Sequence, residues 1–325
     1  MDLATATPTA GVLSLNANGT NAVSATATDA AGNTSTAGTQ SLVIDTTAPS
    51  TPAVTSAALT KNATPTLTGT AEAGSTVTVT VGGATYTTTA TNGTWSINLA
   101  TETPTAGSLA LNANGANPVS ATATDAAGNI SAPGTQSLTI DTTNPNAPVI
   151  TTTLSNSATP TISGTAEAGS TVTVTVGGAT YTTTATNGTW SIDLATETPT
   201  AGSLALNANG ANPVSATATD AAGNISAPGT QSLTIDTTNP NAPVITTTLS
   251  NSATPTITGT AEAGATVTVE VGGATYTTTA TNGTWSIDLA AETPTAGSLA
   301  LNANGANPVS ALVAGAGFEP ATFRL

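Results

Sequence analysis

A block of sequence recurs along this chain with a period of about 95 residues, and this repetition constrains the fold more than any other feature. The Trp of an NGTWSI motif recurs at Trp95, Trp190 and Trp285. The Asp that begins a DTT-x-P motif recurs at Asp45, Asp141 and Asp236. A chain built in this way folds one modest unit several times, and each unit contacts only its neighbours.

The repeat predicts five segments. Residues 1–45 match the second half of a repeat, residues 46–141 and 142–236 are complete repeats, and residues 237–311 begin a third that breaks off. The tail, 312–325, matches no repeat, and it contains Phe318, Phe323 and Arg324. We interpret this tail as a scar of cloning, assembly or a shifted reading frame.

Within residues 46–141 the hydrophobic pattern has a period of two, which is typical of half-buried strands. Val77, Val79 and Val81 alternate with threonines, and Gly82-Gly83 and Asn92-Gly93 are two-residue hairpin signals. Seven strands are predicted, at 53–57, 64–70, 75–81, 84–90, 94–99, 117–124 and 137–140. Seven short strands without a helical period favour an all-β, seven-stranded Greek-key β-sandwich.

The inward positions of these strands predict the core of one repeat. Its expected members are Leu67, Val77, Val79, Val81, Tyr86, Trp95, Ile97, Leu99, Leu109, Val119, Leu138 and Ile140. Trp95 alternates with Ser96 and Ile97, so we expect it in the core and not on the surface as a platform for sugars.

Composition excludes several classes of function. The chain has no Cys and no His, which removes thiol and imidazole chemistry, and no residue set suggests an enzyme. Lys and Arg total 2 against 17 Asp and Glu, for a net charge of -15, so nucleic acid is not an expected partner. No apolar run is long enough to span a membrane, and the N-terminus lacks the pattern of a signal peptide.

Four motifs in a fixed order, TGTAEAGSTVTV, NGTWSI, ATATDAAGN and IDTTAP, resemble the bacterial immunoglobulin-like repeats of large surface adhesins, including biofilm-associated and type I-secreted adhesins. The resemblance covers all but the tail. It implies tandem immunoglobulin-like sandwiches in a linear array. It also implies a secreted, extracellular stalk on the bacterial cell surface, whose partners are neighbouring repeats and whose distal host, surface or matrix ligand is unknown.

The few acidic residues are expected to converge. In an immunoglobulin-like sandwich, the loops after the second and sixth strands and the entering chain share one pole, which brings together Asp45, Glu72 and Asp125. Oxygen ligands without His or Cys suit a hard cation, and related repeats bind calcium at such junctions, so Ca2+ is the predicted cofactor. The predicted ligands at successive junctions are Asp45, Glu72, Asp125 and Asn129; then Asp141, Glu167, Asp220 and Asn224; then Asp236 and Glu262.

Two alternatives stay open. The DAAGN and DTT motifs are also good turns, in which Asp bonds its own backbone and Gly-Asn supplies positive φ. The whole chain could instead be a carbohydrate- or ice-binding module, which predicts exposed aromatic rings or an extended flat threonine face. Three near-equal repeats with few aromatic residues favour the stalk.

Overall fold

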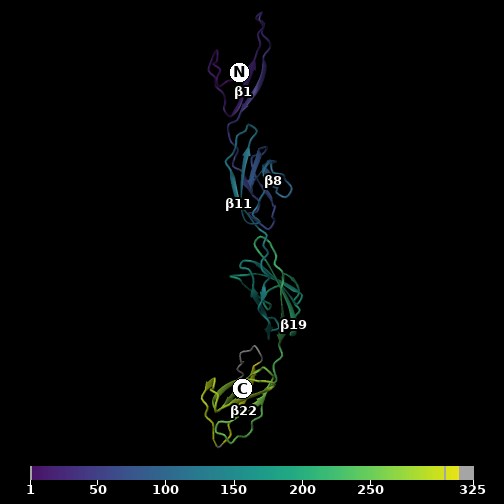
Figure 1. The fold of residues 1–325 in the computed structure, drawn as a ribbon, viewed down its shortest axis with the longest axis vertical. Helices are drawn as coiled ribbons and strands as arrows, with labels where there is room; N and C mark the ends of the chain where they lie inside the picture. Colours follow the sequence, from purple (N-terminus) through teal and green to yellow (C-terminus); the bar gives the residue numbers. More distant parts are fainter. Residues whose placement is uncertain (1, 304, 315–325) are drawn as a thin grey trace. The chain divides into compact units, whose positions relative to one another are not determined.

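The computed structural model describes residues 2–303 and 305–314, and within them strands are the only regular elements (Figure 1). This confirms the all-β prediction. The chain divides into two compact units. The first is Met1–Asn144 with Ala221–Asn224, and the second is Pro145–Asp220 with Ile225–Leu325.

Repeat 46–141 is a sandwich of two sheets. The larger sheet has the order β4-β11-β10-β6-β7-β9 and the smaller has the order β3-β5-β8. The strands are β3 (Ala53–Val54), β4 (Leu59–Thr60), β5 (Thr66–Thr70), β6 (Thr76–Val81), β7 (Ala84–Thr89), β8 (Thr94–Asn98), β9 (Ala106–Gly107), β10 (Asn114–Thr124) and β11 (Gly134–Asp141).

The core lies between these two sheets, as the period-two pattern predicts. Every predicted core side chain of this repeat is buried except Leu109, which is partly buried and packs against the same cluster. The sequence pattern missed the alanines Ala84, Ala90 and Ala121, which are also buried there. A residue as small as alanine carries little signal by itself, although it contributes to close packing between sheets.

The first predicted strand, 53–57, differs from the structure because the chain changes sheets. β3 pairs antiparallel with β5 in the smaller sheet, whereas β4 pairs parallel with β11 in the larger. The predicted strand is thus found only at Ala53–Val54, β4 lies beyond its predicted end, and β9 is a further short strand beside β7. These segments depend on distant partners, which a local pattern cannot reveal.

The two hairpin signals have different outcomes. Gly82-Gly83 joins the paired strands β6 and β7, as predicted. Asn92 and Gly93 also form a turn, with φ of 52° and 80°, but β7 and β8 belong to different sheets. The hairpin prediction is wrong here: only one bridge, Thr91 to Thr94, closes the turn. The chain crosses from the larger sheet to the smaller one here, because β8 pairs with β5.

Repeat 142–236 has the same sheet orders. Its strands are β12 (Val149–Ile150), β13 (Leu154–Ser155), β14 (Thr161–Thr165), β15 (Thr171–Val176), β16 (Ala179–Thr184), β17 (Thr189–Asp193), β18 (Ala201–Gly202), β19 (Asn209–Thr219) and β20 (Gly229–Asp236).

The partial repeats contain subsets of these strands. Residues 1–45 form a two-stranded sheet of β1 (Gly19–Ala25) and β2 (Gly38–Ile44), the counterparts of β10 and β11. The third repeat has β21 (Val244–Ile245), β22 (Thr256–Thr260), β23 (Thr266–Val271), β24 (Ala274–Thr279), β25 (Thr284–Asp288), β26 (Ala296–Gly297) and β27 (Val309–Ala314).

Strand β27 continues past Ala311, the last residue that matches the repeat. Leu312, Val313 and Ala314 extend it, and Val313 packs against the core of the third repeat. The alternation of the strand is thus maintained by residues of the tail. Phe318, Phe323 and Arg324 lie outside the described residues.

Candidate functional site

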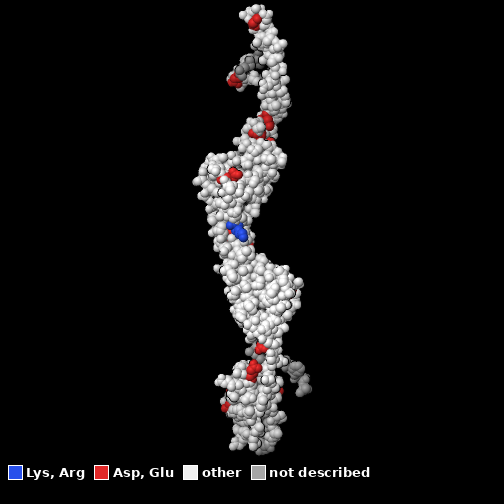
Figure 2. Space-filling model, turned by 90° about the vertical axis from the view of Figure 1, so that its right-hand side faces the viewer, with Lys and Arg blue, Asp and Glu red and all other residues white. Residues whose placement is uncertain are grey.

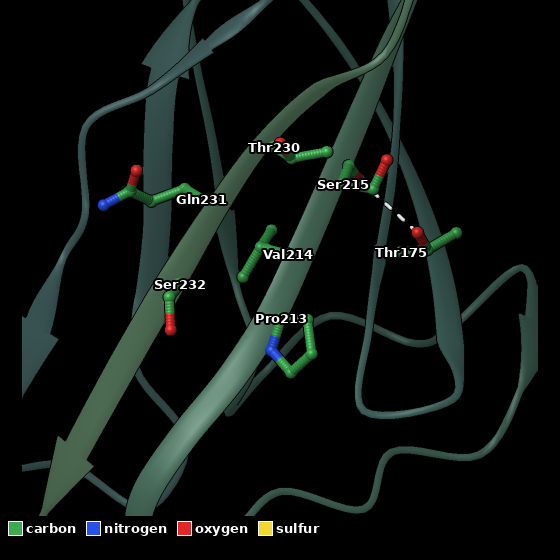
Figure 3. Close-up of a pocket in the computed structure, with 7 residues that line it drawn as sticks. All are labelled: Thr175, Pro213, Val214, Ser215, Thr230, Gln231 and Ser232. Carbon is green, nitrogen blue, oxygen red and sulfur yellow. Dashed lines mark hydrogen bonds between the residues drawn. The ribbon is translucent and has the colours of Figure 1, made fainter.

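The surface offers little that could perform chemistry. The face drawn in Figure 2 is mostly uncharged, with Asp and Glu side chains in small separate groups. The hollow in Figure 3, about 520 Å³, is lined by β15, β19 and β20, with Thr175, Ser215 and Gln231 among its side chains and no charged residue. Every Trp and Tyr of the described residues is buried, so none forms an exposed platform. No helix within residues 2–303 and 305–314 could cross a bilayer.

The loops predicted to meet at one pole of repeat 46–141 do lie at the same end. Thr124, at the end of β10, pairs with Thr76, at the start of β6. The turn that begins at Asp125 and the loop that contains Glu72 therefore share this end. β3 begins here as well, because Ala53 pairs with Thr70 at the end of β5. The strand register places these three segments as the sequence predicts.

Asp125 is the anchor of the DAAGN turn. Its Oδ1 accepts the backbone N–H groups of Ala127 and Asn129, both at 2.9 Å, and its Oδ2 accepts the side-chain amide of Asn129 at 2.8 Å. The side-chain hydrogen bond from Asn129 is the main reason that the pKa of Asp125 lies below its usual value. The carboxylate is thus satisfied by its own turn.

The same Asn129 amide reaches the preceding linker. Its Nδ2 donates to the backbone carbonyl of Asp45 at 3.1 Å. From the other side, Oδ1 of Asn18 accepts the Thr46 N–H at 2.8 Å and the hydroxyls of Thr46 and Thr47 at 2.8 and 3.2 Å. Oδ1 of Asp45 accepts the Thr47 N–H at 2.9 Å. Asparagines of two successive repeats therefore hold one short linker.

We name this arrangement the junction clasp: a DTT linker, the second Asn of the preceding NANG motif, and the Asn of the following DAAGN motif. It recurs at Asp141, within the first compact unit. Oδ1 of Asn114 accepts the Thr142 N–H at 2.8 Å and the Thr143 hydroxyl at 3.1 Å. Nδ2 of Asn224 donates to the Asp141 carbonyl at 2.8 Å.

The third linker has only the first half of the clasp. Oδ1 of Asn209 accepts the Thr237 N–H at 2.8 Å, and Oδ1 of Asp236 accepts the Thr238 N–H at 3.0 Å. Residues 312–325 contain no DAAGN motif that could supply a counterpart of Asn129.

The glutamates lie beside these turns. The predicted ligands Glu72, Glu167 and Glu262 are exposed, and each follows the central strand of the smaller sheet. Their backbone carbonyls accept N–H groups from Ser75, Ser170 and Ala265, all at 3.1 Å. Asp220 is half-buried directly after β19.

Sharing a pole does not assemble a cage of carboxylates. Across residues 2–303 and 305–314, no three acidic side chains form a group that could hold a metal ion. Asp45 and Asp125 each use carboxylate oxygens to cap their own turns. This is the geometry of separate turns, and calcium binding stays a prediction.

The NANG motif is the part of the clasp that sequence reasoning missed. Asn and Thr carry no charge, and a search for catalytic or metal-binding residue types passes over them. The second Asn of NANG precedes the first Thr of DTT by 28 residues at each linker. Every pair of motifs in near-identical repeats keeps a constant separation, so the sequence alone held no signal for this contact.

Comparisons with known proteins agree with this architecture. The sequence profile of the bacterial Ig-like domain matches residues 50–142 and 150–237, which is more than half of the chain. The chain therefore belongs to the bacterial Ig-like domain family. No curated protein matches the sequence.

Solved structures of adhesin repeats are among those similar to this chain. One, from work on host cell surface retention of a 1.5-MDa bacterial ice-binding adhesin, is 27% identical, covers 82% of this chain and 96% of that chain, and has a TM-score of 0.32. Another, a tetra-tandem repeat in the extending region of a large adhesion protein, is 22% identical over 92% of this chain and 82% of that chain, with a TM-score of 0.29.

Proposed function

We propose that this chain is a stalk segment of an extracellular bacterial adhesin, in which successive repeats hold a distal binding region away from the cell surface. Such a segment serves adhesion and biofilm formation without catalysing a reaction. The junction clasp is the observation that carries the proposal. Family membership and the similarity to repeats of bacterial adhesins support it.

A stalk needs linkers that resist bending, and the clasp supplies this resistance. The DTT linker is short, and its first residues make hydrogen bonds to the repeats on both sides. Each bond contributes about 1 kcal/mol at best, and less where water competes. Several such bonds on three consecutive residues restrict the rotations through which a linker of this length would hinge.

The test is to remove the clasp without unfolding the repeats. In one double variant, we expect Asn129→Ala to broaden the distance distribution between spin labels placed on residues 1–45 and 46–141. We expect Asn224→Ala to do the same for labels on repeats 46–141 and 142–236. Asn33→Ala is the matched control, because Asn33 makes the same turn contacts with Asp29 in a half repeat. Thermal unfolding should show that the repeats remain folded. An unchanged distribution in the double variant would contradict the proposal.

We also propose that Ca2+ stiffens the junctions, since acidic residues flank each clasp and a carboxylate retains acceptor capacity after capping a turn. At a dissociation constant of about 10^-4 M, about 10 mM calcium would stabilise one site by about 2.7 kcal/mol. Thermal unfolding with calcium or with chelator measures this. Glu167→Ala should reduce the difference, and Glu72→Ala, Glu167→Ala and Glu262→Ala together should abolish it. Equal melting temperatures in calcium and chelator would reject the cofactor and leave the clasp as the whole junction.

A further inference from the structure

The third repeat has an open sheet edge. β27 pairs with β23 on one side, in the register by which β10 pairs with β6. On its other side β10 pairs with β11 along its length, whereas β27 has no further strand beside it among the described residues. An unpaired strand with free N–H and C=O groups is a template for another strand.

A groove runs beside this edge. In repeat 46–141 the side chains of Leu138 and Ile140 from β11 are fully buried in the core. In the third repeat a hollow of about 470 Å³ lies among Ile257, Leu301 and Val309, the counterparts of residues that contact this part of the core.

The segment on the far side of the groove, which matches β4 and β13, also has no strand paired with it among the described residues. In the complete repeats, β4 and β13 pair parallel with β11 and β20. The matching residues Leu249 and Ser250 form no strand, and Leu249 is 92% exposed. Within residues 2–303 and 305–314, neither of the two edges that would hold a strand is paired with one.

Residues 1–45 of the same chain contain the matching strand. β2 reads GTQSLVI, and β11 reads GTQSLTI over the corresponding residues, so the two differ only at Val43 and Thr139. Leu42 is 40% exposed, whereas its counterpart Leu138 is 1% exposed. β2 thus carries the side chains that fill the groove in an intact repeat, and in the half repeat they are incompletely covered.

We propose that β2 of a second copy of this chain occupies the groove of the third repeat and pairs antiparallel with β27. The β10–β11 interface fixes the register, with Gln40 opposite Val309 and Thr39 opposite Ser310. Leu42 lies opposite Asn307, and its carbonyl accepts from the Asn307 amide, as the Leu138 carbonyl accepts from Asn117 at 3.5 Å. On the other edge, the Val43 N–H donates to the Thr248 carbonyl, as Thr139 donates to Ala58.

The exchange is favourable because β2 keeps its strand pairing and buries more apolar surface. β2 leaves β1, its partner in a two-stranded sheet, and such a sheet is marginal in water by itself. Pairing with β27 replaces the pairing with β1, so the number of backbone hydrogen bonds changes little. Burial of Leu42 and Ile44 in an apolar groove is the net gain.

This contact leads to open-ended assembly. The donor segment lies in the first 45 residues and the groove lies in the third repeat, so one copy can donate and accept at the same time. Contacts between two different surfaces build filaments when they do not close into a ring. β2 also leads directly into the Asp45 linker, so repeat 46–141 of one copy would follow the third repeat of another.

The first test is sedimentation velocity of the full chain from about 1 to about 200 μM, the range in which such exchange shows itself. We expect multiples of the monomer that grow with concentration. Leu42→Asp should leave a monomer, because it places a charge in the groove. Val43→Thr is the matched control, since it restores the residue of β11, and it should assemble like the parent. Neither position belongs to the core of a complete repeat.

Cross-linking tests the register and the identity of the partner. The chain has no Cys, so Thr39→Cys with Ser310→Cys creates one defined pair. Oxidation should give covalent multiples of the chain, whereas Ser24→Cys, on β1, with Ser310→Cys should not. A parent chain that stays monomeric, assembly that survives Leu42→Asp, or a cross-link confined to single chains would overturn the proposal.

Discussion

The same two strands and turn occur twice in the first compact unit, once as residues 19–44 without a covering sheet and once as residues 114–141 within a sandwich. The strand register is the same in both. The environment differs, because Val23 is 46% exposed and its counterpart Val119 is 1% exposed. Local sequence is sufficient for pairing and turn geometry, whereas burial comes only from the second sheet.

The DAAGN turn shows most clearly that local sequence sets the geometry. Asp29 accepts the N–H groups of Ala31 and Asn33 at 2.9 and 2.8 Å, and the Asn33 amide at 2.8 Å. These are the contacts of Asp125 in the complete repeat. The DAAGN turn therefore keeps its geometry without a covering sheet.

The largest expected difference between the two regions is at matched leucines. Leu138→Ala removes a fully buried side chain and should destabilise repeat 46–141 by about 2–5 kcal/mol. Leu42→Ala should change stability by less than about 0.5 kcal/mol at concentrations where the chain is monomeric. Urea unfolding followed by residue-resolved NMR measures both, since no Trp lies in residues 1–45. Equal losses would show that residues 1–45 have a core of their own.

Matched glycines should give the next largest contrast. A Cβ at Gly134 would meet the Pro52 carbonyl directly, whereas a Cβ at Gly38 has only the Ala25 carbonyl nearby, at 3.9 Å. We expect Gly134→Ala to cost about 1–3 kcal/mol through overpacking and Gly38→Ala to cost almost nothing. The same urea titration compares them. A tolerated Gly134→Ala would mean that the chain near Pro52 can move away from β11.

The two aspartates should titrate alike in spite of their different surroundings. Their pKa values are both lowered, chiefly by the side-chain hydrogen bond from the asparagine four residues on. A lowered folded-state pKa contributes stability above the unfolded pKa, and this is lost as the pH falls through the folded pKa. Carboxyl NMR titration should show Asn33→Ala raising the pKa of Asp29, and Asn129→Ala that of Asp125. A rise in the pKa of only one aspartate would show that the two turns hold their carboxylates by different contacts.

The smallest expected effect is at the first half of the clasp. Asn114→Ala removes the acceptor for the Thr142 N–H, and Asn18→Ala does the same for Thr46. We expect each change to cost about 0.5–1.5 kcal/mol and to speed hydrogen exchange at the threonine amide. Exchange accelerated at Thr46 but not at Thr142 would show that the second linker is held by other contacts.

Features that depend on local pattern could be predicted from the sequence, and features that depend on pairing could not. Alternating Val and Thr predicted β6 and its buried face. The crossing at Asn92-Gly93 was missed because the same turn can join strands of one sheet or of two. The clasp was missed because Asn18 and Asn129 meet one linker from repeats that are distant in sequence.

The change of sheets between β3 and β4 has a mechanical consequence. β4 lies near the start of repeat 46–141 and β11 at its end, and they run parallel. Tension on the two ends of the repeat pulls parallel neighbours in opposite directions along their length. Their hydrogen bonds, including that from the Thr139 N–H to the Ala58 carbonyl at 2.7 Å, are then loaded in shear and must break together. A repeat anchored in this way resists stretching longer than one whose terminal strands peel apart one bond at a time.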